Sequence, residues 1–404
     1  MNKWIFSLLL CSSLLLFSTL LLAKEKPSIQ ISPGVYKKLK AVENLVVKKL
    51  YSDALNKLQN IHASVDQGSY SEVLVLRTMA NTYVQTNQYN KAIKALKKCL
   101  ALKIAPDDQQ QEMILNLAQL YMTTNKSAKA IKLLEPWLQQ NPNQDANTRF
   151  MIASAYAQLQ QYTKALPFIN KTITATKKPV ESWYQLKLAL HFGLEQYSES
   201  VSILRKLLKN FPDKKQYWIQ LASVYQHLGQ YKNAVTITHL AYKRQIITTE
   251  KGILNLVNLY LSVGTPFKAA KIMTEEIKSG RISHTSKNWG LLANAWTQAQ
   301  EFNSAIAALT TASTLHDKGS LHQQLGRIYI EQEKWSEAIK AFNQAIAKGG
   351  IKQQGETYIL LGMSHYELDQ PQLAKSTFLK AQKHPKTRET ALQWLDYLDH
   401  STAN

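Results

Sequence analysis

The chain has 404 residues, of which 45% are hydrophobic, so it contains enough apolar side chains to build a large core. Only 14 glycines and 11 prolines are present, which are too few for a turn-rich all-β protein or for a disordered or collagen-like chain. Two cysteines exclude a disulfide scaffold and a cysteine-rich zinc or iron–sulfur site. The formal charge of +21 bears on the partners rather than on the fold. These values indicate a long, basic and mostly helical protein.

The first 23 residues have the pattern of an export signal. Lys3 gives a positive start, an uncharged run extends from Trp4 to Leu22, and Ala23 precedes a polar stretch. This order predicts a secretory signal peptide over residues 1–23, followed by a linker over residues 24–34. The run is also long enough to cross a bilayer, so an uncleaved inner-membrane anchor is the alternative. In both cases the rest of the chain is expected in the periplasm.

Cleavage after Ala23 would leave Cys99 as the one remaining cysteine, without a partner for an internal disulfide. Its neighbours place it on a helix face where a small residue is needed. This predicts a buried and unreactive thiol, and a reactive thiol is the alternative.

Two series of residues repeat along the rest of the chain at intervals of 33 to 38 residues. Members of the first series are small or apolar and lie three positions before an aromatic residue or a histidine: Ala80, Ala118, Ala153, Leu188, Ala222, Val257, Ala293, Gly326 and Gly362. The second series keeps step with the first: Ala54, Ala92, Ala130, Ala165, Ser200, Ala234, Ala269, Ala305, Ala338 and Ala374. Two series in register predict a tandem repeat of one structural unit.

Each repeat has the pattern of two helices joined by a break. In one of them Leu221 and Tyr225 share a helical face, Gly229-Gln230 interrupts the pattern, and Ala234 and Thr238 share the face of a second helix. Prolines mark the ends of several units, because proline lacks the amide donor: Pro106, Pro142, Pro179, Pro212 and Pro385. Pro136 instead falls inside a second helix, at a cost of about 3 kcal/mol unless the helix kinks there.

The pattern resembles the tetratricopeptide repeat. Trp218-x2-Leu221-Ala222-x2-Tyr225 and Trp289-x2-Leu292-Ala293-x2-Trp296 match the first half of that repeat, and Ala374-x3-Phe378 matches the second half. The resemblance implies an all-α fold, a right-handed superhelix of about ten helix-turn-helix repeats over residues 35–386. The first repeat, about residues 35–68, is degenerate, as a terminal repeat is expected to be. Residues 387–400 are expected to form a capping helix.

Several local strings are similar to one group within that family. They are Asn116-Leu117-Ala118-Gln119-Leu120-Tyr121, Tyr217-Trp218-Ile219-Gln220-Leu221-Ala222, Pro266-Phe267-Lys268-Ala269-Ala270-Lys271 and Pro385-Lys386-Thr387 with Gln393-Trp394-Leu395. They look like the periplasmic tetratricopeptide proteins of Gram-negative bacteria that accompany TonB–ExbB–ExbD energy-transduction systems. This resemblance implies TonB-system components as partners and an accessory role in outer-membrane uptake.

The sequence lacks the patterns that catalysis or cofactor binding requires. The ten histidines form no His-Glu-x-x-His pair, and there is no phosphate loop, nucleophile elbow or Cys-x-x-Cys motif. His191 and His365 replace the tyrosine of their repeats, which favours packed core histidines over ligands. We therefore expect a protein that is not an enzyme and that needs no metal or other cofactor.

A concave groove lined by the first helix of each repeat is the expected partner site. In the family the groove positions lie three before, one after and four after each member of the first series. The residues selected from these positions are Arg77, Asn81, Gln119, Met122, Phe150, Phe192, Asn258, Asn294, Arg327 and Met363. Amide side chains offer a donor and an acceptor together, which suits the backbone of an extended peptide. Phenylalanine and methionine offer sequence-tolerant apolar contacts.

The leading hypothesis is therefore a periplasmic protein-protein interaction scaffold. An adaptor for peptidoglycan or envelope-polysaccharide assembly machinery is the alternative, because basic residues such as Lys91, Lys94, Lys97 and Lys98 gather on a second helix and could contact anionic envelope surfaces. A solvated helix face is the plainer interpretation of those lysines. Nucleic acid is not expected as a partner of an exported chain.

Overall fold

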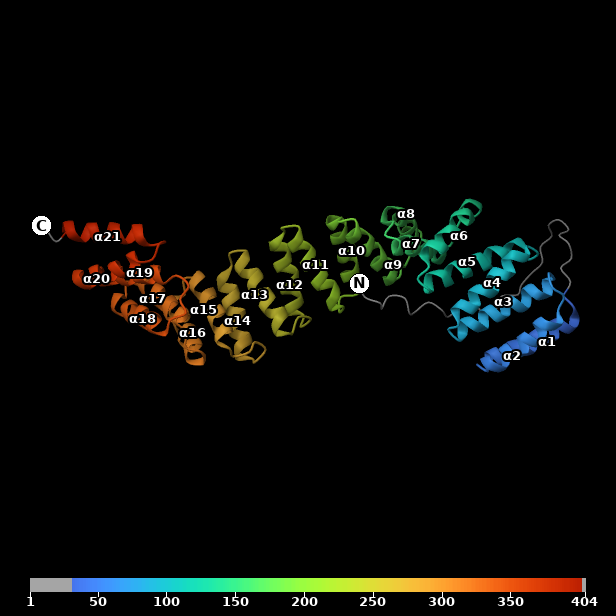
Figure 1. The fold of residues 1–404 in the computed structure, drawn as a ribbon, viewed down its shortest axis with the longest axis horizontal. Coiled ribbons are helices and arrows are strands. Elements are labelled where there is room, and N and C mark those ends of the chain that lie inside the picture. Colours follow the sequence, from blue (N-terminus) through green and yellow to red (C-terminus); the bar gives the residue numbers. More distant parts are fainter. Residues whose placement is uncertain (1–30, 402–404) are drawn as a thin grey trace. The chain divides into compact units, whose positions relative to one another are not determined.

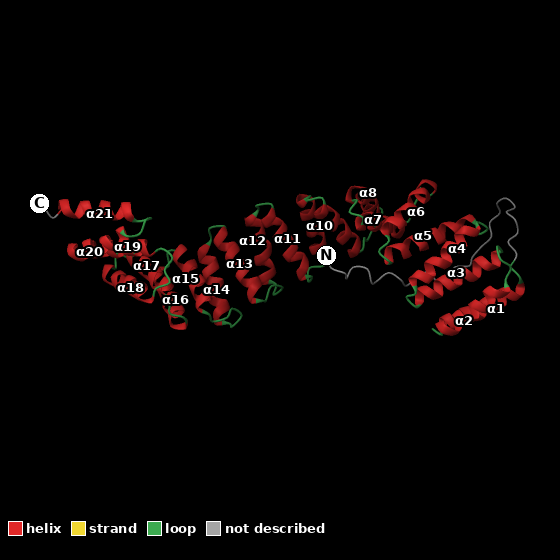
Figure 2. Cartoon of the chain, in the orientation of Figure 1, coloured by secondary structure: helices red, strands yellow, loops and turns green. Residues whose placement is uncertain are grey.

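The computed structural model describes residues 31–401. This part of the chain is all α, with 21 helices and no strand (Figures 1 and 2). The helices fall into two compact units, and the boundary between Ile203 and Leu204 lies inside one helix. Between residues 31 and 401 no helix is both long and apolar enough to cross a membrane. The expected export signal over residues 1–23, and residues 24–30 of the expected linker, lie outside the described residues.

The helices follow one another as ten pairs and a final single helix. Unit 1 contains α1 (Pro33–Val47), α2 (Tyr51–Ser64), α3 (Tyr70–Gln85), α4 (Tyr89–Leu102), α5 (Asp107–Thr123), α6 (Ser127–Gln140), α7 (Ala146–Gln158), α8 (Tyr162–Thr174) and α9 (Glu181–Gly193). The unit boundary lies within α10 (Tyr197–Asn210). Unit 2 contains α11 (Lys215–His227), α12 (Tyr231–Lys243), α13 (Glu250–Ser262), α14 (Pro266–Lys278), α15 (Ser286–Gln298), α16 (Phe302–Leu315), α17 (Gly319–Glu331), α18 (Trp335–Lys348), α19 (Gln354–Glu367), α20 (Pro371–Gln382) and α21 (Arg388–Ser401). Odd-numbered helices up to α19 are called first helices below, and even-numbered helices second helices.

The described helices begin at Pro33 and end at Ser401. The first pair is complete and begins at Pro33, two residues inside the expected linker. Helix α21 occupies the expected capping stretch, and its Ala391, Leu395 and Leu398 are buried against the last pair. Helix α6 runs through Pro136 to Gln140, so this proline does lie within a second helix.

Every pair from α3 onward turns in the same way. The second residue after the end of the first helix has a left-handed backbone, with φ between +55° and +69°, at Asn87, Asn125, Gln160, Glu195, Gly229, Gly264, Gln300, Glu333 and Asp369. The next residue donates its N–H to the carbonyl of the aromatic or histidine residue five positions earlier, at 2.7–3.0 Å. Gln88 bonds Tyr83 in this way, and Gln230 bonds Tyr225. This Schellman turn satisfies carbonyls that the helix end would leave unpaired.

The two series of small residues form the core. All ten members of the second series have no exposed surface. The members of the first series are 0–6% exposed at the seven positions from Ala80 to Ala293, and Gly326 and Gly362 are buried too. Small side chains at these positions let the two helices of a pair approach closely, which is why their spacing carries the repeat signal.

Two repeats of unit 2 replace the small alanine with glycine and place a phenylalanine opposite it. A Cβ added at Gly326 would lie 2.5 Å from Cε1 of Phe342, and one added at Gly362 would lie 2.6 Å from Cε1 of Phe378. Both rings are fully buried. Each ring therefore occupies the space that a side chain on the first helix would need.

The two histidines that replace tyrosine are core residues, as the sequence predicts. His191 and His365 are 8% and 9% exposed. In each, Nδ1 lies within hydrogen-bond distance of the Oε1 of the glutamine five residues later, at 2.8 Å for Gln196 and 2.7 Å for Gln370. Cys99 is also buried, and burial is the main cause that raises the pKa of its thiol to about 12. The thiol is therefore protonated and unreactive at neutral pH.

Candidate partner-binding site

First helices form the more closely packed layer of each unit. In unit 1 helix α1 contacts α3, α5 contacts α7, and α7 contacts α9, and in unit 2 helix α17 contacts α19. Within residues 31–401 no two successive second helices contact each other as extensively. The side chains that the first helices of each unit present are here called the first-helix layer.

The position directly after each member of the first series is the most accessible part of this layer. Its occupant is exposed in seven of nine repeats: Asn81, Gln119, Ala189, Ser223, Asn258, Asn294 and Arg327. The two exceptions are Ser154, which is buried, and Met363, which is half-buried. Of the residues selected from the sequence, the four amides and Arg327 therefore lie where a partner could reach them.

The positions three before and four after each member of the first series contribute mostly half-buried side chains, which pack on neighbouring helices. Phe150 lies against Trp183 of the next first helix, with ring centroids 6.4 Å apart. Phe192 meets Tyr197 edge to face at 6.0 Å. Each phenylalanine exposes only part of its ring.

The structure corrects one residue of the site predicted from the sequence, Met122. Its side chain is 4% exposed and belongs to the core cluster around Ala118, Ala130 and Leu134. A flexible thioether fills irregular gaps in a core, and it does so here. Met122 is therefore not available to a partner and is removed from the candidate site.

The two selected arginines are held by carboxylates of the next first helix. Arg77 on α3 pairs with Glu112 on α5, with Nη2 and Oε2 2.7 Å apart. Arg327 on α17 pairs in the same way with Glu356 on α19, also at 2.7 Å. All four side chains are partly exposed, so each pair adds at most about 1 kcal/mol to stability. Their effect is to cancel charge within the layer and to fix the arginine side chains.

One selected residue lies at a shallow hollow. Asn258 lines it with Glu250, Lys251, Leu254 and Asn255, all from α13. Glu250 accepts hydrogen bonds from Ser283 Oγ at 2.6 Å and from Asn288 Nδ2 at 2.8 Å. These bonds hold the pKa of the Glu250 carboxyl below its ordinary value. The hollow therefore combines a fixed negative charge, the positive charge of Lys251, and amide and apolar groups.

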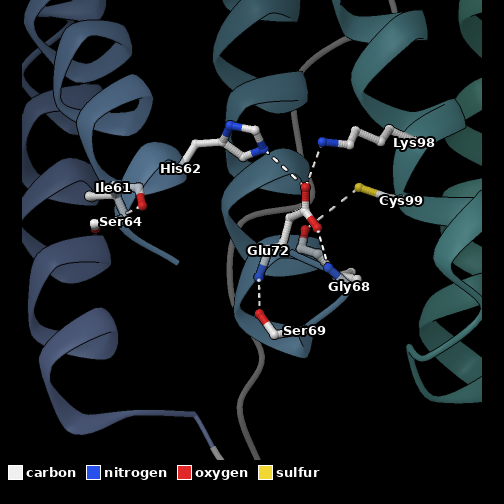
Figure 3. Close-up of polar contacts among 9 residues, drawn as sticks. Ile61, His62, Ser64, Gly68, Ser69, Glu72, Lys98 and Cys99 are labelled. Carbon is white, nitrogen blue, oxygen red and sulfur yellow. Dashed lines mark hydrogen bonds and ion pairs between the residues drawn. The ribbon is translucent and has the colours of Figure 1, made fainter. Parts of the chain in front are cut away.

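A buried carboxylate in unit 1 was not predicted from the sequence. Glu72 on α3 is 2% exposed and lies between α2 and α4 (Figure 3). Its carboxylate contacts His62 Nε2 at 3.2 Å and Lys98 Nζ at 2.6 Å, and accepts the Gly68 N–H at 2.7 Å. Burial raises the pKa of Glu72, but these hydrogen bonds outweigh it and hold the pKa below the ordinary 4.5. The cluster joins three helices and is structural.

The stability of unit 1 should therefore depend on the ionisation of Glu72. Because its folded pKa is lowered, the carboxylate stabilises the fold fully above pH 4.5 and loses this contribution as the pH falls through the lower folded value. Urea unfolding of the native chain and of Glu72→Gln should differ most at pH 7, and the difference should shrink on acidification. Glu43→Gln, at an exposed site on α1, is the matched control. A difference that stays constant with pH would contradict this role.

Unit 2 contains a second buried network. Glu276 on α14 is 1% exposed, and its Oε1 accepts the hydroxyl of Tyr242 on α12 at 2.5 Å and Arg281 Nη2 at 2.6 Å. Arg281 Nε lies 2.5 Å from the other carboxylate oxygen. Burial, and then the bond to Glu276, raise the pKa of Tyr242 to about 12. Since every charged group here has a partner, the network links two second helices and offers no reactive group.

No group of three or more His, Cys, Asp or Glu side chains suited to a metal ion is present among the described residues. This is the geometry of a helical-repeat protein whose accessible groups are spread over the successive first helices of each unit. The chain contains tetratricopeptide repeats: models of that repeat match residues 83–147, 146–179, 215–237 and 320–350. Members of this family are protein-protein interaction scaffolds and typically not catalytic.

Solved structures similar to this chain are distant in sequence. A tetratricopeptide repeat protein from Parabacteroides merdae is 14% identical, with 73% of this chain and 98% of that chain covered and a TM-score of 0.42. The peptide-binding tetratricopeptide protein YrrB is 13% identical, with 47% and 96% covered and a TM-score of 0.38. The Cut9–Hcn1 hetero-tetramer of the APC/C is 13% identical, with 90% and 83% covered and a TM-score of 0.32. A search of the curated proteins found no significant match.

Proposed function

We propose that the chain binds an extended segment of a protein partner along its first-helix layer. The observation that carries the proposal is the repeated amide directly after the first series. Asn81 and Gln119 on neighbouring first helices of unit 1 and Asn258 on α13 are exposed, and the described contacts include no hydrogen bond to their side chains. An amide offers a donor and an acceptor at once, so such a row can pair with the unpaired backbone groups of an extended peptide.

Apolar side chains beside the amides would add contact area. Phe150 and Phe192 in unit 1 and Met363 in unit 2 are half-buried, and Ile219 on α11 is 49% exposed. Partly exposed rings that are already held by their neighbours lose little conformational freedom when a partner covers them. We therefore expect a segment with apolar residues placed between stretches of backbone that the amides bind.

The finer proposal is a periplasmic accessory of a TonB-type energy-transduction system. It is supported by the export pattern of residues 1–23 and by the local strings similar to the TonB-associated group. A reporter that is active only in the periplasm, fused after Asn404, tests the compartment. Activity of a cytoplasmic reporter at the same position, and none of the periplasmic one, would contradict it.

In-cell photocrosslinking tests the binding surface. A photoreactive residue in place of Asn258 or Phe192 should capture one discrete protein, and the TonB proposal expects a component of that system. The matched control is the same probe at Lys340, which is exposed on the second helix α18. Capture of the same set of proteins from both layers would overturn the binding proposal, whereas capture of an unrelated protein at Asn258 alone would overturn only the TonB assignment.

A further inference from the structure

Helix α19, the last of the first helices, meets α21 through a group of aromatic rings. Tyr366 on α19 contacts Trp394 and Tyr397 on α21, with ring centroids 5.6 and 5.8 Å apart, and Trp394 contacts Tyr397 at 6.0 Å. Phe378 on α20 stacks on Trp394 at 5.3 Å and holds that ring in place. Tyr397 is 51% exposed, whereas Tyr366 and Trp394 are half-buried. Tyr366, Trp394 and Tyr397 are here called the aromatic cluster.

Carboxylates lie beside the aromatic cluster without a basic partner. Glu367 follows Tyr366 on α19 and is exposed, and Asp369 lies in the turn after that helix. Neither carboxylate has an ion pair among those recorded for residues 31–401, and α19 contains no lysine or arginine. The hydrogen bond to Tyr397 is the main cause that raises the pKa of Tyr366, and the charges of Glu367 and Asp369 raise it further. The negative charges are therefore close enough to act on the cluster.

Other aromatic rings of the chain hold a cation of the chain itself. Seven such contacts are recorded within residues 31–401, and in one of them Lys91 Nζ lies 5.6 Å from the centroid of the Tyr83 ring. The face of an aromatic ring is electron-rich and attracts a cation. None of these contacts involves the aromatic cluster, and Lys375 of α20 pairs with Asp399 instead. The cluster thus combines rings and carboxylates that suit a cation from another molecule.

We propose that the aromatic cluster, together with Glu367, binds an arginine side chain of the partner's extended segment. The inference rests on the proposed function and names one residue of that segment. A guanidinium is planar, so it can lie over the exposed ring of Tyr397 while its N–H groups reach a carboxylate. Met363, Tyr366 and Glu367 are spaced i, i+3 and i+4, so they share one face of α19. Met363 is the residue directly after the first series, so the arginine site continues the row of exposed amides.

The two tyrosine hydroxyls provide a donor for the backbone beside that arginine. The Oη atoms of Tyr366 and Tyr397 lie 3.0 Å apart, and no other hydrogen bond of either hydroxyl is recorded within residues 31–401. Each hydroxyl carries one proton, so the contact uses one of the two protons and leaves the other. A carbonyl of an extended segment can accept it. The site can therefore bind a cationic side chain and a neighbouring peptide group together.

Fluorescence anisotropy with the full chain and two short labelled peptides tests the proposal. One probe is a glycine–serine peptide that contains arginine, and the other contains citrulline, which keeps the planar group but not the charge. The arginine peptide should bind about 2- to 10-fold more tightly. In the double variant Glu367→Gln, Tyr397→Leu this preference should fall to about one-fold, whereas Tyr397→Phe keeps the ring face and should retain most of it.

The matched control is Glu331→Gln, Tyr231→Leu, which makes the same changes at exposed positions on α17 and α12 and should keep the preference. Equal binding of the two peptides, or equal losses in the two double variants, would overturn the proposal. If a probe at Asn258 still captures a discrete protein in that case, only the arginine assignment fails. Self-association of the chain that the first double variant abolishes would overturn the proposal in favour of a second copy. Circular dichroism and melting of all variants should match the native chain.

Discussion

Replacing Phe342 with alanine is expected to lower the free energy of unfolding of unit 2 by about 3–5 kcal/mol. The ring has no exposed surface and packs with Ala338, Leu361 and partly buried neighbours of α17 and α19. Removing it leaves a cavity that the facing Gly326 cannot fill, because a glycine has no side chain to move into it. Urea unfolding, followed by hydrogen exchange of α17 and α18, measures the loss. Lys340→Ala on the exposed side of α18 is the control and should change little.

Gly326→Ala tests the same contact from the other helix. The new Cβ would lie 2.5 Å from the Phe342 ring, so the ring must shift, at a cost of about 1–3 kcal/mol. Combining Gly326→Ala with Phe342→Leu should cost clearly less than the sum of the single changes, since leucine vacates the space that alanine needs. If the losses in unfolding free energy of the two single variants simply add in the double variant, the side chains at positions 326 and 342 do not compete for the same space.

Replacing Arg281 with methionine is expected to destabilise unit 2 by about 3–5 kcal/mol, because it leaves a buried carboxylate without its counter-charge. Glu276 is 1% exposed and would retain only the hydroxyl of Tyr242. Thermal and urea unfolding at pH 7 measure the effect. The double variant Glu276→Met, Arg281→Met removes both charges and should recover a large part of the loss.

The exposed ion pair between Arg327 and Glu356 supplies the control for this experiment. Arg327→Met removes one partner of a pair whose side chains are 46% and 41% exposed, so the freed Glu356 is solvated and the change should stay within about 1 kcal/mol. Losses of equal size for Arg281→Met and Arg327→Met would contradict the role given to burial.

The fold could be predicted from the sequence because its decisive contacts are local and repeated. Ala234 and the other members of its series carry the same signal ten times, and the structure buries all of them completely. The turn geometry is a backbone property that Asn87, Glu195 and Gly264 adopt alike, so residue identity alone does not reveal it. The histidine substitutions at 191 and 365 were correctly assigned to the core because they share the helix face of the tyrosines they replace.

The contacts that could not be predicted from the sequence join residues that the repeat pattern does not relate to each other. Tyr242 and Glu276 lie 34 residues apart, close to one repeat, but each belongs to a different repeat position and nothing in either helix indicates that they meet. Glu72 resembles an ordinary helix-start acid until the structure brings His62 and Lys98 to it. Met122 was misplaced because its flexible side chain packs into the core with Ala130 and Leu134 of α6, whereas Phe192 at the same repeat position stays partly exposed.

The pairing of Arg77 with Glu112 and of Arg327 with Glu356 cancels the charge of both arginines in the first-helix layer. Ligands held beside these pairs would be chosen by shape and backbone pattern, and their retention would vary little as ions are added or withdrawn.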